Sequence, residues 1–132
     1  MKQGESKDMG MEAEIRVLLA DDEPVVRSAI GALLETDPRF RVIASVGTAA
    51  AAADAATSLR PDLAVIDVRM PGGGGAAITA IRAQSPETVV MVCSSHDDGQ
   101  TRRSMVQAGA VAYAVKGADD VLDMARSALG LS

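Results

Sequence analysis

The chain has 132 residues, a formal net charge of −5 and 48% hydrophobic residues, with one phenylalanine, one tyrosine and no tryptophan. This length fits one domain whose core must consist of aliphatic side chains and alanine. The acidic balance argues against a surface that binds nucleic acid throughout, and no run reaches the ~20 apolar residues that span a bilayer, so we expect no membrane contact.

Residues 1–13 mix charged, polar and methionine residues without periodicity, and we expect a disordered leader there, followed by one domain over residues 14–132. In that domain short apolar runs alternate with segments of helical period. We expect strands at 15–20, 41–45, 62–67, 88–94 and 111–115, and helices at 24–35, 48–59, 76–84, 100–108 and 118–130.

Local signals support the helices. Pro24 stands where a first turn tolerates proline, and Gly109 stands where a helix ends. We expect the first helix to bury one face with Val26, Ile30 and Leu33. The alanine-rich second helix should be thinly packed, with Leu59 on its buried side.

The expected strands are apolar throughout, without polar alternation. This pattern is typical of strands buried on both faces, and therefore of a parallel sheet covered by helices. Right-handed crossovers then give a doubly wound (βα)5 three-layer α/β sandwich. Cys93 lies inside the fourth run, so we expect a buried thiol, no disulfide framework and a cytoplasmic location.

Polar side chains follow four of the five strands. They are Asp21, Asp22, Asp67, Ser94, His96 and Lys116, whereas the second strand ends without a charged residue at Ser45, Val46 and Gly47. Functional groups of such folds collect at the carboxyl ends of the strands. Three carboxylates in one place would raise one another's pKa unless a cation joins them, and oxygen ligands favour Mg²⁺. A carboxylate beside Mg²⁺ and a lysine can act as a nucleophile toward a phosphoryl group.

These residues resemble the receiver domains of two-component response regulators. The resemblance covers Ile15 to about Leu129 and is carried by "LLADDEP", by "PDLAVIDVRMPGGGG", by the hydroxyl of Ser94 and by "GAVAYAVKGA". It implies a flavodoxin-like sheet of order 2-1-3-4-5, and a protein that catalyses only its own phosphorylation and dephosphorylation.

The resemblance also implies the site roles. Asp67 would accept a phosphoryl group from a sensor histidine kinase, with Lys116 pairing with its oxygens. Mg²⁺ would be held by Asp22 and Asp67, by Asp21 through water, and by the backbone carbonyl of Arg69. The four glycines after Pro71 would then give clearance and a tight turn.

A switch is implied as well. Ser94 would hydrogen-bond the phosphoryl group, and Tyr113 would turn inward and change the face formed by the fourth helix, fifth strand and fifth helix, through which a homodimer could form. The side chains of Arg69 and His96 would tune dephosphorylation, and we expect their bulk to give a phosphoryl lifetime of minutes or longer. Tyr113 as a plain core residue and His96 as a plain loop residue are the alternatives.

Departures from the family pattern leave the catalytic groups in place. Gly117 stands where proline after a cis bond is common, so the conformation of the Lys116–Gly117 bond is open. The function we expect is phosphorelay signalling that switches an output domain absent from this chain, with transcription regulation favoured. The rivals are a stand-alone or degenerate receiver that only binds proteins, and an aspartyl-phosphate phosphohydrolase.

Overall fold

The computed structural model describes residues 13–131, so the leader predicted for residues 1–13 lies almost wholly outside the described residues. Strands and helices alternate along the described part. They are β1 (Ile15–Ala20), α1 (Pro24–Leu34), β2 (Phe40–Val46), α2 (Ala49–Leu59), β3 (Leu63–Ile66), α3 (Gly74–Gln84), β4 (Val89–Ser94), α4 (Gly99–Ala108), β5 (Ala112–Val115) and α5 (Val121–Ala128).

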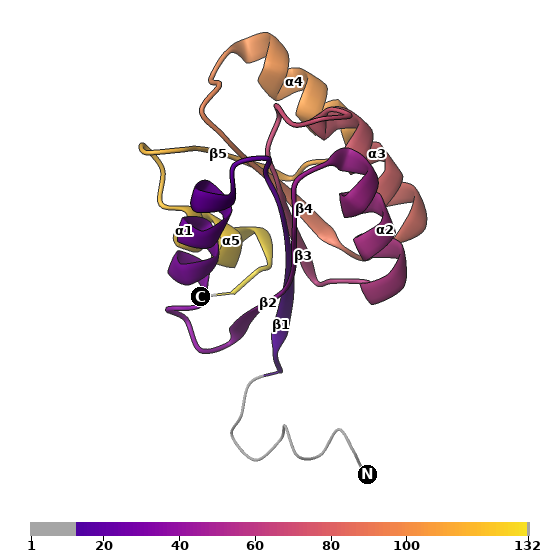
Figure 1. The fold of residues 1–132 in the computed structure, drawn as a ribbon. Coiled ribbons are helices and arrows are strands. Elements are labelled where there is room, and N and C mark those ends of the chain that lie inside the picture. The colour runs from indigo at the N-terminus through magenta and orange to yellow at the C-terminus, as the bar shows by residue number, and fades with distance from the viewer. Residues whose placement is uncertain (1–12, 132) are drawn as a thin grey trace.

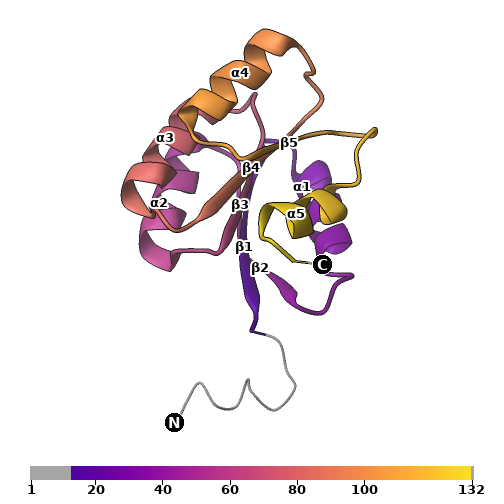
Figure 2. The ribbon, with the colours of Figure 1, turned by 180° about the vertical axis from the view of Figure 1, so that it is seen from behind.

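The strands form one parallel sheet in the order β2-β1-β3-β4-β5, which confirms the predicted topology. Helices α1 and α5 cover one face of the sheet, and α2, α3 and α4 cover the other (Figure 1). The view from behind shows the same three layers (Figure 2). None of the helices among residues 13–131 has the length and apolar content that a membrane crossing requires.

The core consists of one hydrophobic cluster on each face of the sheet. Leu18, Ile66 and Ile78 belong to the cluster under α2, α3 and α4, and Leu34 and Met91 to the cluster under α1 and α5. Each strand contributes to both clusters, because successive side chains of a strand point to opposite faces. Cys93 is 2% exposed, as predicted for a buried thiol, and burial raises its pKa to about 11.

Two predictions about helix faces are wrong. α1 buries Gly31 and Leu34, whereas Leu33 is 40% exposed and borders a groove next to α5. α2 buries only alanines, and Leu59 in its last turn is 38% exposed. In α1 the buried face is Gly31 and Leu34, with Ile30 packed against the core beside them. In α2 the alanines allow the helix to pack closely against the sheet.

The helix boundaries follow local chemistry. α1 begins at Pro24 and α4 ends at Gly109, as predicted. The side chain of Asp120 accepts a hydrogen bond from the backbone N–H of Asp123, so α5 begins at Val121 and is shorter than the predicted segment 118–130.

An ionic cluster around the buried Asp37 joins the turn after α1 to α5. We call it the Asp37 cluster, and it consists of Asp37, Arg39 and Arg126. Arg39 Nη2 lies 2.7 Å and Arg126 Nε lies 3.2 Å from Asp37 Oδ2. The side-chain and backbone hydrogen bonds from Arg39 outweigh burial and, together with Arg126, hold the pKa of Asp37 well below its ordinary value. Nothing in the sequence pattern singled out this cluster.

Candidate functional site

Backbone hydrogen bonds between neighbouring strands fix the residues at the carboxyl edge of the sheet. The N–H of Asp21 donates to the carbonyl of Val46 (3.0 Å), and the N–H of Asp67 donates to the carbonyl of Ala20 (2.9 Å). The N–H of Lys116 donates in the same way to the carbonyl of Ser94 (2.9 Å). Each of these three residues is therefore held one position beyond its strand by the strand next to it.

Three carboxylates meet at this edge, as predicted. Asp21, Asp22 and Asp67 each offer one oxygen, and these oxygens lie within 4.8 Å of one another. Asp21 and Asp67 are buried, whereas Asp22 is exposed. The arrangement offers oxygen ligands to a hard divalent cation from one open side.

Lys116 reaches the same carboxylates from the end of β5. Its Nζ lies 2.6 Å from Asp21 Oδ2 and 3.4 Å from Asp67 Oδ2. Burial alone would lower the pKa of Lys116, but the hydrogen bond to Asp21 and the charge of Asp67 outweigh burial, and the pKa lies above its ordinary value. The lysine therefore brings a positive charge to the site at neutral pH.

Asp67 is less well compensated than Asp21. Burial raises the pKa of Asp67 above its ordinary value; the charge of Lys116 opposes that rise and the charge of Asp21 adds to it. Asp21, by contrast, accepts a hydrogen bond from Lys116 on one oxygen and from the backbone N–H of Glu23 (2.9 Å) on the other. A further positive charge would therefore stabilise the ionised form of Asp67.

Ser94, His96 and Tyr113 form a second part of the site, at the end of β4. The hydroxyl of Ser94 is fully buried and accepts a hydrogen bond from the N–H of His96 (3.1 Å). The hydroxyl of Tyr113 donates to the carbonyl of His96. The half-buried His96 therefore connects the two predicted switch residues through its backbone.

Tyr113 is 6% exposed, so its ring is inside the protein in this structure. The guanidinium of Arg102 lies over the ring, 4.6 Å from its centre, and forms an ion pair with Asp97 (2.7 Å). This contact covers the tyrosine with a side chain of α4, on the face formed by α4, β5 and α5.

The glycine run after β3 has a backbone role. Gly72 and Gly73 have φ angles of +90° and +86°, which L side chains rarely adopt, so the tight turn requires glycine there. A Cβ on Gly74 would lie 2.4 Å from the backbone carbonyl oxygen of Asp67, and α3 could then not start so close to β3. Arg69, in the same loop, is exposed.

The loop after Lys116 accommodates Gly117 without a cis bond. Every peptide bond in the described part of the chain is trans, including the one between Lys116 and Gly117. Gly117 has a φ of +79°, which glycine adopts freely.

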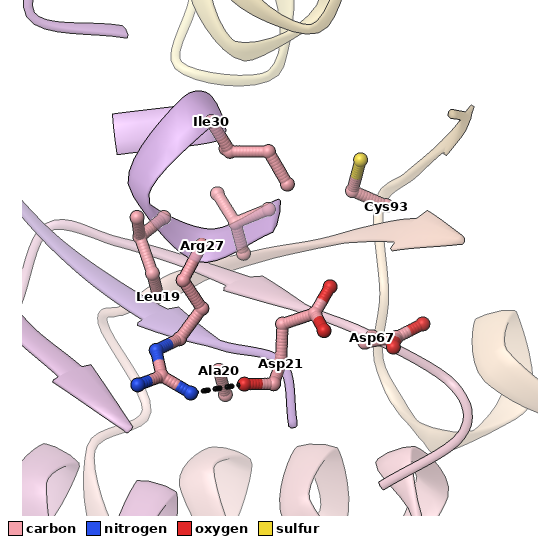
Figure 3. A pocket seen from close by; sticks show the side chains of 8 residues that line it. Leu19, Ala20, Asp21, Arg27, Ile30, Asp67 and Cys93 are labelled. Atoms are coloured by element: carbon pink, nitrogen blue, oxygen red, sulfur yellow. Dashed lines mark hydrogen bonds between the residues drawn. The ribbon is translucent and has the colours of Figure 1, made fainter. Parts of the chain in front are cut away.

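Sequence reasoning missed one residue that touches the site. Arg27 of α1 donates from Nη1 to the backbone carbonyl of Asp21, and it lines a small cavity together with Asp21, Asp67 and Cys93 (Figure 3). The helical period could not have identified it, because arginines on a helix surface are usually solvated.

Known proteins are similar to this chain in sequence and in fold. A family model described as response regulator receiver domain matches residues 17–125. The DNA-binding transcriptional activator DevR/DosR of Mycobacterium tuberculosis is 33% identical over 103 residues, which cover 77% of this chain and 48% of that protein. Protein-glutamate methylesterase/protein-glutamine glutaminase 5 of Geobacter metallireducens is 35% identical over 114 residues, 85% of this chain and 32% of that protein.

Among solved structures, the signal receiver domain of the putative response regulator NarL from Mycobacterium tuberculosis superimposes with a TM-score of 0.84 at 25% identity. The match covers 90% of this chain and 98% of that one. The chain thus matches nearly the full length of the solved receiver domain. It spans half or less of the length of the two curated relatives. It belongs to the response regulator receiver domain family of two-component signalling.

Proposed function

We propose that Asp67 is the phosphoryl acceptor of this receiver. The observation that carries the proposal is the pairing of a buried, under-compensated carboxylate with Lys116, whose Nζ lies 3.4 Å from Asp67 Oδ2. A carboxylate held in this way can attack phosphorus, while the lysine offsets charge that develops on the transferred oxygens.

The phosphoryl transfer needs only the phosphohistidine of the kinase, Asp67 and a proton from solvent. A carboxylate oxygen of Asp67 forms a bond to the phosphorus of a phosphohistidine on the kinase, and the bond from phosphorus to the imidazole nitrogen breaks. The electron pair of that bond leaves with the imidazole, which takes up a proton. In the later hydrolysis, water forms a bond to the phosphorus and the bond from phosphorus to the Asp67 oxygen breaks. This step releases inorganic phosphate and returns the carboxylate.

Mg²⁺ is the cofactor we propose, and the donor set fits it. Asp22 and Asp67 would hold the ion directly, Asp21 through water and Arg69 through its carbonyl, because the three carboxylates offer oxygens within 4.8 Å and one of them is open to solvent. When bound, the ion offsets negative charge on the phosphoryl oxygens.

The switch we propose runs from Ser94 to Tyr113. The Ser94 hydroxyl would leave His96 and donate to a phosphoryl oxygen. Tyr113, which the sequence led us to expect to turn inward on activation, already has its ring inside in this structure, so we propose that activation holds it there as the loop 95–98 adjusts. The face formed by α4, β5 and α5 would change with that loop, because Arg102 contacts both Tyr113 and Asp97.

The surfaces around the site support two protein partners. A sensor histidine kinase would dock beside the site on the groove between α1 and the β5–α5 loop, where Val25 is 81% and Leu33 40% exposed. A second copy would dock on the α4-β5-α5 face, where Val106 is 57% exposed. The free, buried thiol of Cys93 fits a reducing cytoplasm, where we place this exchange.

The output we favour is transcription regulation. The similarity to the DNA-binding activator DevR/DosR supports it, since this chain spans 48% of that protein. A catalytic output is the second candidate, because a methylesterase/glutaminase also carries a matching segment. The receiver itself would catalyse no reaction other than its own phosphorylation and dephosphorylation.

Phosphorylation is tested by incubating the chain with acetyl phosphate, with and without Mg²⁺, and measuring the intact mass. We expect one Mg²⁺-dependent phosphoryl group on the wild type and none on Asp67→Asn. Stoichiometric labelling of Asp67→Asn would contradict the assignment of Asp67. No labelling of the wild type would favour a degenerate receiver, and turnover of a generic phosphate ester would favour a phosphohydrolase.

We also propose that Arg69 and His96 slow the loss of the phosphoryl group. Arg69 is exposed in the loop after Asp67, and His96 is half-buried next to Ser94. From these positions their bulk would hinder the attacking water. A labelled protein should keep its phosphoryl group for minutes or longer, and Arg69→Ala combined with His96→Ala should shorten that time. A wild-type half-life of a few seconds would contradict the proposal.

A further inference from the structure

The end of β2 carries no charged residue, but it forms a seat for Arg27 of α1. Arg27 Nε donates to the hydroxyl of Ser45 (2.9 Å), and its Nη1 donates to the backbone carbonyl of Asp21. One guanidinium therefore joins α1, the end of β2 and the first residue after β1.

A bulge in β2 places Ser45 where Arg27 can reach it. The pairing of β1 with β2 shifts between Val17 and Leu18, so that Val42 pairs with Val17 and Ala44 with Leu18. Val42 packs against the core cluster under α1 and α5, whereas Ala44 and Val46 pack against the opposite cluster. Ser45, between Ala44 and Val46, therefore faces α1.

Gly47 completes the seat. A Cβ at this position would lie 3.3 Å from Arg27 Nη1, 3.7 Å from the Asp21 carbonyl oxygen and 3.7 Å from the Asp22 Cα. A side chain here would crowd the guanidinium and would contact the Asp21–Asp22 peptide at an ordinary van der Waals distance. The absence of a side chain at Gly47 leaves room for the contact.

The acceptor of Arg27 is the oxygen of the peptide that joins Asp21 to Asp22. Fixing this oxygen fixes the plane of the peptide, and with it the direction in which the chain enters Asp22. Figure 3 shows the guanidinium on the carbonyl side of Asp21, with the carboxylate on the other side, toward Asp67. Asp22, the exposed member of the acidic cluster, depends on this peptide for its position because β1 ends at Ala20.

We infer that Arg27, seated on Ser45 and Gly47, is a positioning residue that holds the Asp21–Asp22 peptide so that the Asp22 carboxylate meets Asp67 for Mg²⁺ binding. The inference rests on the proposed Mg²⁺ site. By its charge alone, Arg27 would lower the affinity for Mg²⁺, because a nearby cation repels the ion. As a positioning residue it raises that affinity, because it holds a ligand correctly.

The test is a Mg²⁺ titration of Arg27→Met in the full chain, followed by the amide NMR shifts of Asp22 and Asp67. If Arg27 positions the ligands, the affinity for Mg²⁺ should fall by about 10-fold, the size of effect known for residues that orient metal ligands. The carbonyl ¹³C shift of Asp21 should change in the metal-free protein, since its hydrogen bond is lost. Unchanged or tighter Mg²⁺ binding by Arg27→Met would overturn the inference.

Ser45→Ala is the second variant, because it removes an acceptor of Arg27 at an exposed position and changes no charge. It should weaken Mg²⁺ binding in the same direction but less, and if Arg27→Met does not fold, unchanged affinity in Ser45→Ala overturns the inference. Arg41→Met is the matched control for Arg27→Met, because it makes the same substitution away from the acidic cluster. Arg41 lies in β2, as Ser45 does, and pairs with the exposed Glu14 (3.2 Å). This control should bind Mg²⁺ as the wild type does. Absence of Mg²⁺ binding by the wild type would instead refute the proposed function.

Discussion

Two aspartates of this protein are buried to nearly the same extent, but their pKa values are shifted in opposite directions. Asp37 is 5% exposed and Asp67 is 7% exposed. Asp37 receives hydrogen bonds from two arginines and has a lowered pKa, whereas Asp67 shares one lysine with Asp21 and has a raised pKa. The comparison teaches that burial alone does not set the direction of a pKa shift, and that the number of compensating cations does. The less compensated Asp67 is the one that we propose as the functional carboxylate.

Removing the cation of each carboxylate should give the largest difference between the two regions. Lys116→Gln should slow labelling of Asp67 by acetyl phosphate by about 100-fold, because the charge on the transferred oxygens loses a preorganised partner. Arg126→Gln, which removes a cation from Asp37, is the matched control and should label at the wild-type rate. Equal labelling rates for the two variants would contradict the proposal that Lys116 assists the phosphorylation of Asp67.

Neutralising each aspartate should change stability in opposite directions. Asp37→Asn should lower the Tm by several degrees, because Arg39 and Arg126 lose the charged acceptor that they share. Asp67→Asn should raise the Tm in the absence of Mg²⁺, since a buried charge with insufficient compensation is removed. Thermal unfolding followed by circular dichroism measures both, and shifts of the same sign would contradict the distinction.

Acid should remove the contribution of Asp37. Its pKa is lower in the folded protein than in the unfolded chain, so the stabilisation is fully present above the unfolded pKa of about 3.9 and is lost as the pH falls toward the folded value. The difference in unfolding free energy between the wild type and Asp37→Asn should therefore stay constant from about pH 7 to pH 5 and shrink below about pH 4. Urea unfolding at several pH values measures it, and a difference that grows in acid would contradict the assigned pKa direction.

The sequence predicted the site better than it predicted the packing. Asp21, Asp22, Asp67 and Lys116 could be placed together because parallel strands end at one edge, whatever the details of the helices. The burial of Leu33 and Leu59 was predicted wrongly, because helical period shows that a helix is amphipathic but not how closely it approaches the sheet.

The missed contacts depend on geometry that residue types do not reveal. Arg27 reaches Ser45 because a bulge turns Ser45 toward α1, and a bulge leaves no signal in the apolar run of β2. Asp37 and Arg126 are 89 residues apart in sequence and meet only because α5 packs beside α1. Both are long-range consequences of the fold, which motifs at strand ends do not encode.

The smallest predicted effect concerns Arg126, whose contact is the longer of the two in the Asp37 cluster. Arg126 Nε lies 3.2 Å from Asp37 Oδ2 and its side chain is 34% exposed, whereas the Arg39 contact is shorter, at 2.7 Å. Arg126→Gln should therefore lower the Tm less than Asp37→Asn does, and Arg41→Gln, which breaks the exposed pair with Glu14, should leave it unchanged.

The double variant Asp37→Asn, Arg126→Gln decides whether that small effect comes from the pair itself. Because the two side chains are in contact, the effects of the single substitutions should not add, and the double variant should be more stable than their sum implies. Additive effects would mean that Arg126 stabilises α5 through its own helix and not through Asp37. The Asp37 cluster would then stabilise only the turn after α1, through the contact between Asp37 and Arg39, and would not attach α5 to that turn. The compensation of Asp37 would come from Arg39.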